Sequence, residues 1–341
     1  MKADLRLNRR RTAEMYRQVG GETFSQSGFS YEAWVRATRW AEIYTDAGPE
    51  QVFVEPTNAC SGQCFGCPNP SMQRARESLA VDRFQRVAEA WSLLDCRWVF
   101  SGLGEPLLNT DLPDFIRRVG SWHTMLITSV LVDPPEGFPW DQLDLVSLTA
   151  DALEEKRFSQ LRPGCSWSKV SRLLEFFVAA KQASPEAFPE IGVTLMKSSE
   201  NADLDAAFLS YWRQVSKPPF RNEFGEFPLG APCDKVQWFQ IKGPSDFLGT
   251  IPYPGSIRYT PLKRRACLHG LTGFSLHSNG TIALCPFDVE GRWPLGHLGQ
   301  QSPEEIWTSP QAKELRRQLL TGDYHDPWPC SSCQDWYHSS V

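Results

Sequence analysis

Three cysteines with the spacing of a metal-cluster loop lie together on one glycine-containing stretch, at Cys60, Cys64 and Cys67. This spacing brings three thiolates close enough to hold three corners of a cubane iron-sulfur cluster. A four-iron cluster needs one ligand per iron, so the loop leaves one iron open to a ligand that is not protein. The alternative is a structural zinc site, which needs a fourth cysteine or histidine, and residues 54–76 contain none.

A second set of four cysteines follows near the C-terminus, at Cys267, Cys285, Cys330 and Cys333. Asn279 and Gly280 stand between alternating apolar residues, a pattern that predicts a β-hairpin. The hairpin is expected to bring the first two of these cysteines near each other. Four cysteines can close one cubane cluster without another ligand, and they would serve a zinc ribbon equally well.

The elements that must position these cysteines alternate between strands and helices from residue 51 onward. Such alternation predicts an α/β fold with a parallel sheet and covering helices, and functional residues gather at the carboxyl ends of the strands. The first cysteine loop follows the first strand. Strands are expected at 51–55, 97–101, 125–129, 143–149, 191–196 and 236–241, and helices at 31–44, 81–94, 112–120, 167–183 and 203–215.

The first cysteine loop, with an aromatic residue and a glycine before its last cysteine, resembles the signature of the radical S-adenosylmethionine (radical SAM) superfamily. The glycine-rich segment 102–106 resembles that family's Gly-Glu-Pro element, whose glycines allow close backbone approach to a ligand. The third strand departs from the family, because it ends in Thr128, Ser129 and Val130 instead of a Thr-Asn-Gly-like turn. The resemblance implies a SAM site built from Phe65, Gly102, Gly104, Glu105, Ser147 and Arg162.

Each of these residues has a role that the resemblance implies. Phe65 shields the cluster or touches adenine, and Gly104 and Glu105 seat the methionine part of SAM. Ser147 corresponds to a serine that reaches the ribose, and Arg162 to an arginine common after the fourth strand. For both, an ordinary loop hydrogen bond is the alternative.

The C-terminal piece resembles the SPASM/twitch auxiliary-cluster domain of radical SAM enzymes along 280–307. A full SPASM domain has seven cysteines, and the four here imply one auxiliary cluster. The resemblance implies an α/β fold with a partial (β/α)6 TIM-like barrel and a small C-terminal domain of one β-hairpin plus helix. The expected organisation is an N-terminal helical extension at 1–50, the core barrel at 51–215, a bridging segment at 216–265 and the auxiliary-cluster domain at 266–341.

The cofactors implied are a [4Fe-4S] cluster with an open iron for SAM, one auxiliary [4Fe-4S] cluster and SAM itself, with a flavodoxin- or ferredoxin-type electron donor. The leading hypothesis is dehydrogenation of a small sugar or aminocyclitol-like substrate. Two alternatives stay open. One is radical modification of a peptide or protein, and the other is epimerisation with Cys233, in the bridging segment, as the hydrogen-atom donor.

Composition and charge limit the partners and the cellular compartment that are expected for this protein. The formal net charge of −5 does not predict a nucleic-acid or membrane partner, and no apolar run is long enough for a membrane span. Because no export signal precedes them, the ten cysteines are interpreted as residues of a reducing cytoplasm. Outside the two sets, Cys96 and Cys165 are expected to be small buried apolar side chains.

Overall fold

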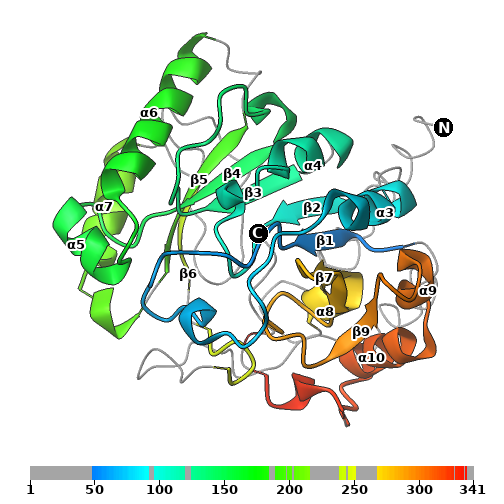
Figure 1. Cartoon of the computed structure of the whole chain (residues 1–341). Helices are drawn as coiled ribbons and strands as arrows, with labels where there is room; N and C mark the ends of the chain where they lie inside the picture. Colours follow the sequence, from blue (N-terminus) through cyan, green and yellow to red (C-terminus); the bar gives the residue numbers. More distant parts are fainter. Residues whose placement is uncertain are drawn as a thin grey trace, which may run out of the picture.

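A computed structural model describes residues 48–91, 96–119, 124–183, 189–196, 198–201, 203–215, 238–242, 245–250, 267–325, 327–333 and 335. Its centre is a sheet in which nine described strands follow the order β6-β5-β4-β3-β2-β1-β7-β8-β9 (Figure 1). Strands β1 to β6 all pair in parallel, as the alternating pattern predicted. They are β1 Gln51–Val54, β2 Arg97–Phe100, β3 Thr124–Thr128, β4 Leu145–Thr149, β5 Glu190–Met196 and β6 Trp238–Lys242.

Helices cover one face of the parallel strands because each carries an apolar stripe. In α3 (Val81–Trp91) the buried residues recur at helical spacing. One of them, Phe84, stacks on Phe115 of α4 (Leu112–Val119) with ring centroids 4.4 Å apart. The remaining core helices are α5 Glu155–Leu161, which the sequence did not predict, α6 Trp167–Ala183 and α7 Asp205–Val215.

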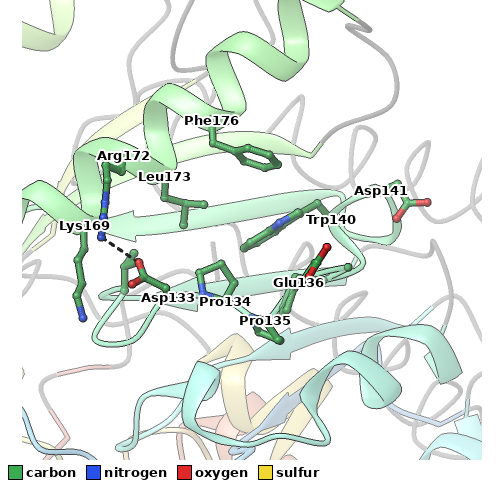
Figure 2. Close-up of a pocket in the computed structure, with 13 residues that line it drawn as sticks. Asp133, Pro134, Pro135, Glu136, Trp140, Asp141, Lys169, Arg172, Leu173 and Phe176 are labelled. Carbon is green, nitrogen blue, oxygen red and sulfur yellow. Dashed lines mark hydrogen bonds and ion pairs between the residues drawn. The ribbon is translucent and has the colours of Figure 1, made fainter.

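The crossover from β3 to β4 has no α-helix and contains only the 3-10 turn η3 (Trp140–Gln142). A proline-rich loop takes the place of a helix and leaves a pocket of about 540 Å³ against α6. Figure 2 shows Trp140 of the loop and Phe176 of α6 in this pocket, with Arg172 paired to Asp133 at its edge. None of the predicted site residues lines the pocket, so it is separate from the candidate site.

The C-terminal residues extend the same sheet (Figure 1). Strand β7 (Gly273–Leu276) lies parallel to β1, and β8 (Thr281–Ala283) and β9 (Pro294–His297) continue antiparallel. The predicted hairpin at Asn279 and Gly280 is confirmed, and its glycine adopts a φ of 89°. The accompanying helices are α8 Leu268–Thr272, α9 Pro303–Trp307 and α10 Pro310–Thr321, followed by the 3-10 turn η5 Pro329–Ser331.

The helices and strands expected between 51 and 215 are present, with ends that differ by a few residues. The helix expected at 31–44 lies outside the described residues, as do Cys233 and most of the bridging segment. Among the described helices, none has the length and apolar character that crossing a membrane requires.

Candidate functional site

The loop that carries Cys60, Cys64 and Cys67 begins at the carboxyl end of β1, where the fold predicts functional residues. The turn closes through the Cys67 N–H, which donates to the Cys64 carbonyl at 3.1 Å. Burial raises the pKa of the Cys67 thiol to about 11 and also raises that of Cys60. The charge of Cys64 also raises the pKa of both thiols, so the three side chains lie near one another.

Residues 161–165, after α5, lie directly against this loop. The N–H groups of Gln63 and Phe65 donate to the carbonyls of Pro163 and Leu161, each at 2.8 Å. Gly164 has a φ of 92°, and a Cβ there would stand 3.0 Å from the Ser61 carbonyl oxygen. A segment about 100 residues away in sequence therefore fixes the shape of the cysteine loop.

Arg162 connects the cysteine loop to the ends of β3 and β4. Its Nε donates to Asp151 at 2.6 Å, and its Nη1 donates to the Ser129 hydroxyl at 3.0 Å and to the Cys64 sulfur at 3.5 Å. A hydrogen bond with Cys165, together with this cation, lowers the pKa of the Cys64 thiol. Arg162 is thus a positive group beside one predicted cluster ligand, and its ion pair with Asp151 is buried.

Glu105 is buried, and its carboxylate accepts hydrogen bonds from the end of β3. Thr128 donates its hydroxyl at 2.5 Å, and the N–H of Ser129 donates at 3.0 Å. Burial raises the pKa of this carboxyl, while the hydrogen bonds act in the opposite direction. Its own N–H donates to the Ala59 carbonyl at 3.1 Å. Glu105 therefore joins the cysteine loop to β3, and its N–H, its carbonyl and its carboxylate all have partners within the protein.

Gly102 and Gly104 lie so close to other parts of the protein that neither position has room for a side chain. A Cβ on Gly104 would stand 2.1 Å from the Thr57 carbonyl oxygen and 2.8 Å from that of Ala59. Gly102 adopts a φ of 144°, and a Cβ there would stand 2.7 Å from the Glu55 side chain. Both glycines pack against the start of the cysteine loop. Their need for glycine is therefore explained by packing within the protein, whereas the sequence had suggested close approach of a ligand.

We expect Gly104→Val to displace the cysteine loop and to lower the iron bound there, because no rotamer relieves a clash between Cβ and backbone oxygens. Iron per chain, measured after anaerobic reconstitution, should fall toward the content of the C-terminal set alone. Gly137→Ala is a control for substituting a glycine where space is open, because nothing lies within 4 Å of its Cβ position. Full iron content in Gly104→Val would contradict this packing role.

A buried ion pair joins the barrel to the C-terminal residues. Glu55, directly after β1, receives a bidentate pair from Arg74 at 2.9 and 2.8 Å. Ser278, in the turn after β7, also donates its N–H and hydroxyl to Glu55, and the Nε of Arg74 donates to the Val289 carbonyl at 2.7 Å. Burial raises the pKa of the Glu55 carboxyl, but the hydrogen bonds and nearby charges outweigh it and the net shift is downward.

We expect Arg74→Met to reduce the free energy of unfolding by about 3–5 kcal/mol, because it leaves the Glu55 carboxylate buried without its cation. The double variant Glu55→Gln, Arg74→Met should recover part of this loss, since no buried charge remains. Urea unfolding of the full chain under anaerobic conditions measures both. Arg172→Met is the control, because its pair with Asp133 is about two-thirds exposed and is expected to contribute about 1 kcal/mol at most.

The same pair predicts a pH dependence. The folded pKa of Glu55 lies below its usual value, so its contribution is present at neutral pH and is lost as the pH falls through the folded value. Wild type should therefore lose more unfolding free energy on acidification than the double variant does. Equal acid sensitivity of the two proteins would be inconsistent with this contribution.

Two further residues that were predicted to contact SAM differ in exposure, since Ser147 is buried and Phe65 is exposed. Ser147 alternates along β4 with two fully buried core residues, so it points to the face that the helices do not cover. Its hydroxyl lies 3.3 Å from that of Thr194 on β5. Phe65 stands on the cysteine loop with 45% of its surface exposed. An exposed aromatic ring beside the cysteines can contact a planar ligand.

The four C-terminal cysteines converge. Burial raises the pKa of Cys285 well above its usual value, and the charges of Cys267, Cys333 and Cys330 raise it further. Burial raises the pKa of Cys333 to about 12, with Asp335 and two of the same cysteines adding to the shift. The charges of these thiols act on one another's pKa values, so the four cysteines lie in one neighbourhood, and thiolates are the donors that soft metal clusters prefer. As described, the side chains are not closed around a metal position, because no group of three or more Cys, His, Asp or Glu among the described residues has the arrangement of a metal site.

Sequence reasoning missed four residues that shape the first cysteine loop. Glu55 is the last residue of one predicted strand and Asp151 stands two residues after another, and a charged residue at a strand end is a signal that could have identified them. Nothing local indicated that Arg74 would pair with Glu55. Cys165, expected to be a small apolar side chain, is buried but hydrogen-bonds to Cys64.

Comparison with known proteins adds an independent finding for the C-terminal region. Residues 267–334 match the SPASM family, described as an iron-sulfur cluster-binding domain. A protein described as a probable GTP 3',8-cyclase, from Archaeoglobus fulgidus, is 26% identical over 125 residues. That match covers 36% of this chain and 42% of the relative, so the chain spans less than half of that protein's length.

Two groups of solved structures share the fold. SuiB from Streptococcus suis, bound to precursor peptide SuiA, aligns with a TM-score of 0.58 and 11% identity over 96% of this chain and 83% of that chain. The protein anSMEcpe with bound AdoMet aligns with a TM-score of 0.54 and 15% identity over 85% of this chain and 84% of that chain. At these identities the likeness shows the fold alone.

Proposed function

We propose that this chain, a radical SAM protein with a C-terminal SPASM domain, uses SAM to abstract a hydrogen atom from its substrate and then oxidises the substrate radical. The observation that carries the proposal is the presence of two cysteine sets, three cysteines in the loop after β1 and four in the C-terminal residues, whose thiols act on one another's pKa values within each set. When bound, one cluster and SAM supply a 5'-deoxyadenosyl radical, and the other cluster accepts an electron.

The chain's own residues bind and orient the reactants. Cys60, Cys64 and Cys67 hold the first cluster, and Arg162 donates to one of these sulfurs. Backbone groups of segment 102–106 lie beside the cysteine loop and are proposed to meet the methionine part of SAM. The hydroxyl of Ser147, which is buried on the face of the sheet that the helices do not cover, is proposed to meet the ribose.

The second cluster is held by Cys267, Cys285, Cys330 and Cys333. With four protein ligands this cluster has no free iron for substrate, so it is better suited to taking an electron. The first electron, which cleaves SAM, comes from a flavodoxin- or ferredoxin-type donor.

The leading substrate is a small hydroxylated molecule of the sugar or aminocyclitol type. The radical takes one hydrogen atom from a carbon that carries a hydroxyl group. If the C-terminal cysteines hold a cluster, it would accept the one electron that the substrate radical loses, the hydroxyl proton would go to solvent, and the product would be a ketone. The hydroxyl of Thr194, which is buried 3.3 Å from that of Ser147, is the proposed partner for such a substrate.

Modification of a peptide is the second candidate. It is favoured by the likeness to SuiB bound to precursor peptide SuiA and to anSMEcpe with bound AdoMet and Cp18Cys peptide. Both likenesses show only a shared fold, so a peptide substrate is a hypothesis for this chain. Epimerisation with Cys233 as hydrogen-atom donor remains an alternative whose key residue lies outside the described part of the chain.

Product mass tests the proposal. The reconstituted protein, given SAM and a reductant, is incubated with an aminocyclitol panel and with a peptide panel, and 5'-deoxyadenosine formation identifies the substrate class. Dehydrogenation should yield a product two hydrogens lighter than the substrate, in light and in heavy water alike. An unchanged mass in light water, with one solvent deuteron in heavy water, would contradict oxidation and support epimerisation.

A further inference from the structure

One crossover of the parallel sheet lacks the helix that the other crossovers have. The connections that follow β1, β2, β4 and β5 each contain an α-helix, whereas residues 129–144, all of which the structure describes, contain none. A helix is the usual connection between parallel strands, and it covers the sheet beside its neighbours. The pocket of about 540 Å³ between this loop and α6 therefore lies where a covering helix is missing.

The surface of this pocket is mainly apolar and aromatic. Trp140 of the loop and Phe176 of α6 come from its two sides, with ring centroids 6.5 Å apart, and Phe176 keeps 46% of its surface exposed (Figure 2). The two cations at the edge are already engaged, because Lys169 donates to a backbone carbonyl at 2.8 Å and Arg172 pairs with Asp133 at 3.1 Å. Such a pocket fits apolar side chains of a protein segment better than it fits a charged ligand.

The chain carries a segment of matching chemistry shortly before the sheet begins. Residues 31–44 lie outside the described residues, and their sequence places apolar side chains at helical spacing, at Tyr31, Trp34, Val35, Ala41 and Tyr44. These side chains form one stripe along a helix, and charged side chains fall on its other side, at Glu32, Arg36 and Arg39. Burying one aromatic side chain of such a stripe removes about 150–250 Å² from water.

This segment can reach the pocket from the point where the described chain begins. Gly48 lies just before β1, and η3, which contributes Trp140 to the pocket, lies just before β4, so both are at the amino edge of the sheet. Three strand spacings separate β1 from β4, a distance of about 14 Å. The chain between residues 44 and 48 can span about 14 Å, and a helix over residues 31–44 extends about 21 Å further.

We propose that residues 31–44 dock on this pocket as an amphipathic helix and supply the cover that the crossover between β3 and β4 lacks. The stripe that contains Trp34 faces the aromatic side chains of the pocket, and the charged side faces solvent. The loop of the pocket begins at Val130, next to Ser129, whose N–H donates to Glu105. The docked segment thus lies behind one wall of the candidate site, and the proposal does not depend on the chemistry of that site.

Hydrogen exchange of the full chain, followed by mass spectrometry, tests the docking from the side of the segment. Trp34→Ser removes an aromatic member of the stripe, and Trp40→Ser is the matched control, because residue 40 lies about 120° from residue 34 around a helix. If the segment is docked in about nine molecules of ten, Trp34→Ser should raise the exchange rate of residues 130–142 about tenfold. Trp40→Ser should leave that rate unchanged, and unchanged exchange of β4 shows that each variant is folded.

The reciprocal experiment changes the pocket and follows the segment. Phe176→Ser should raise the exchange rate of residues 31–44 by a similar factor, because the free energy of docking is shared by the two surfaces. Tyr211→Ser is the control, since it removes another exposed aromatic side chain, on α7, and should leave residues 31–44 unchanged.

Unchanged exchange of residues 130–142 in Trp34→Ser would overturn the proposal, because the pocket would then be open or covered by something else. Light scattering identifies one such alternative. A dimer that Phe176→Ser converts to a monomer would overturn the proposal in favour of a second copy on this pocket. None of these measurements uses iron content or SAM cleavage, so failure of the docking is distinguishable from failure of the proposed function.

Discussion

Replacing Cys60, Cys64 and Cys67 together with alanine is expected to remove about half of the iron and to abolish SAM cleavage. Two four-iron clusters predict about eight irons per chain, and the variant should retain about four. The cysteine loop is held in shape by backbone hydrogen bonds from residues 161–165 and from Glu105. The fold should therefore survive the loss of the three sulfurs.

Iron analysis and 5'-deoxyadenosine formation after anaerobic reconstitution measure this result. Cys96→Ala serves as a control for removing a buried sulfur, since Cys96 lies in the core before β2. An N-terminal zinc site predicts a different outcome, in which the wild type contains one zinc ion and about four irons. Residual SAM cleavage in the triple variant would show that the cleaving cluster is held elsewhere.

Replacing Cys285 and Cys330 with alanine is expected to have the second-largest effect, and of a different kind. It should remove the other half of the iron and suppress the oxidised product while SAM cleavage continues. The reason is that these cysteines belong to the C-terminal set, whereas the proposed SAM-cleaving site lies at the carboxyl end of β1. The electron from the substrate radical then has no acceptor within the chain.

The measurement is the ratio of oxidised product to 5'-deoxyadenosine, with iron content determined in parallel. Wild type should give a ratio near one, and the variant a ratio near zero with substantial 5'-deoxyadenosine. Because the variant could lose stability, its urea midpoint is compared with that of wild type. A normal ratio in a variant that lacks the C-terminal iron would exclude this cluster as the electron acceptor. Zinc in the C-terminal set would do the same.

The sequence by itself determined the features that depend on short-range patterns. The spacing of Cys60, Cys64 and Cys67 is a local property of one loop, and helical or alternating periodicity predicts each element separately. The turn at Asn279 and Gly280 was predictable for the same reason, because only a few residue types tolerate its backbone angles. The order of strands and helices between residues 51 and 215 therefore followed from the chain alone, apart from α5.

Only the tertiary structure decided which of these pieces meet. Periodicity does not say that β7 pairs with β1, which places the C-terminal cysteines on an extension of the same sheet. Nor does it reveal that the Glu105 carboxylate is directed to the end of β3, or that a Cβ on Gly104 would meet the backbone at Thr57.

The position of Cys165 beside Cys64 shows the same limit most clearly. The two residues are about 100 positions apart in sequence, and each alone is compatible with a buried apolar side chain. Their contact depends on how α5 leads into residues 161–165 and on the backbone hydrogen bonds that dock this segment on the cysteine loop. Contacts between distant segments are set by packing of the whole chain, which no local pattern encodes.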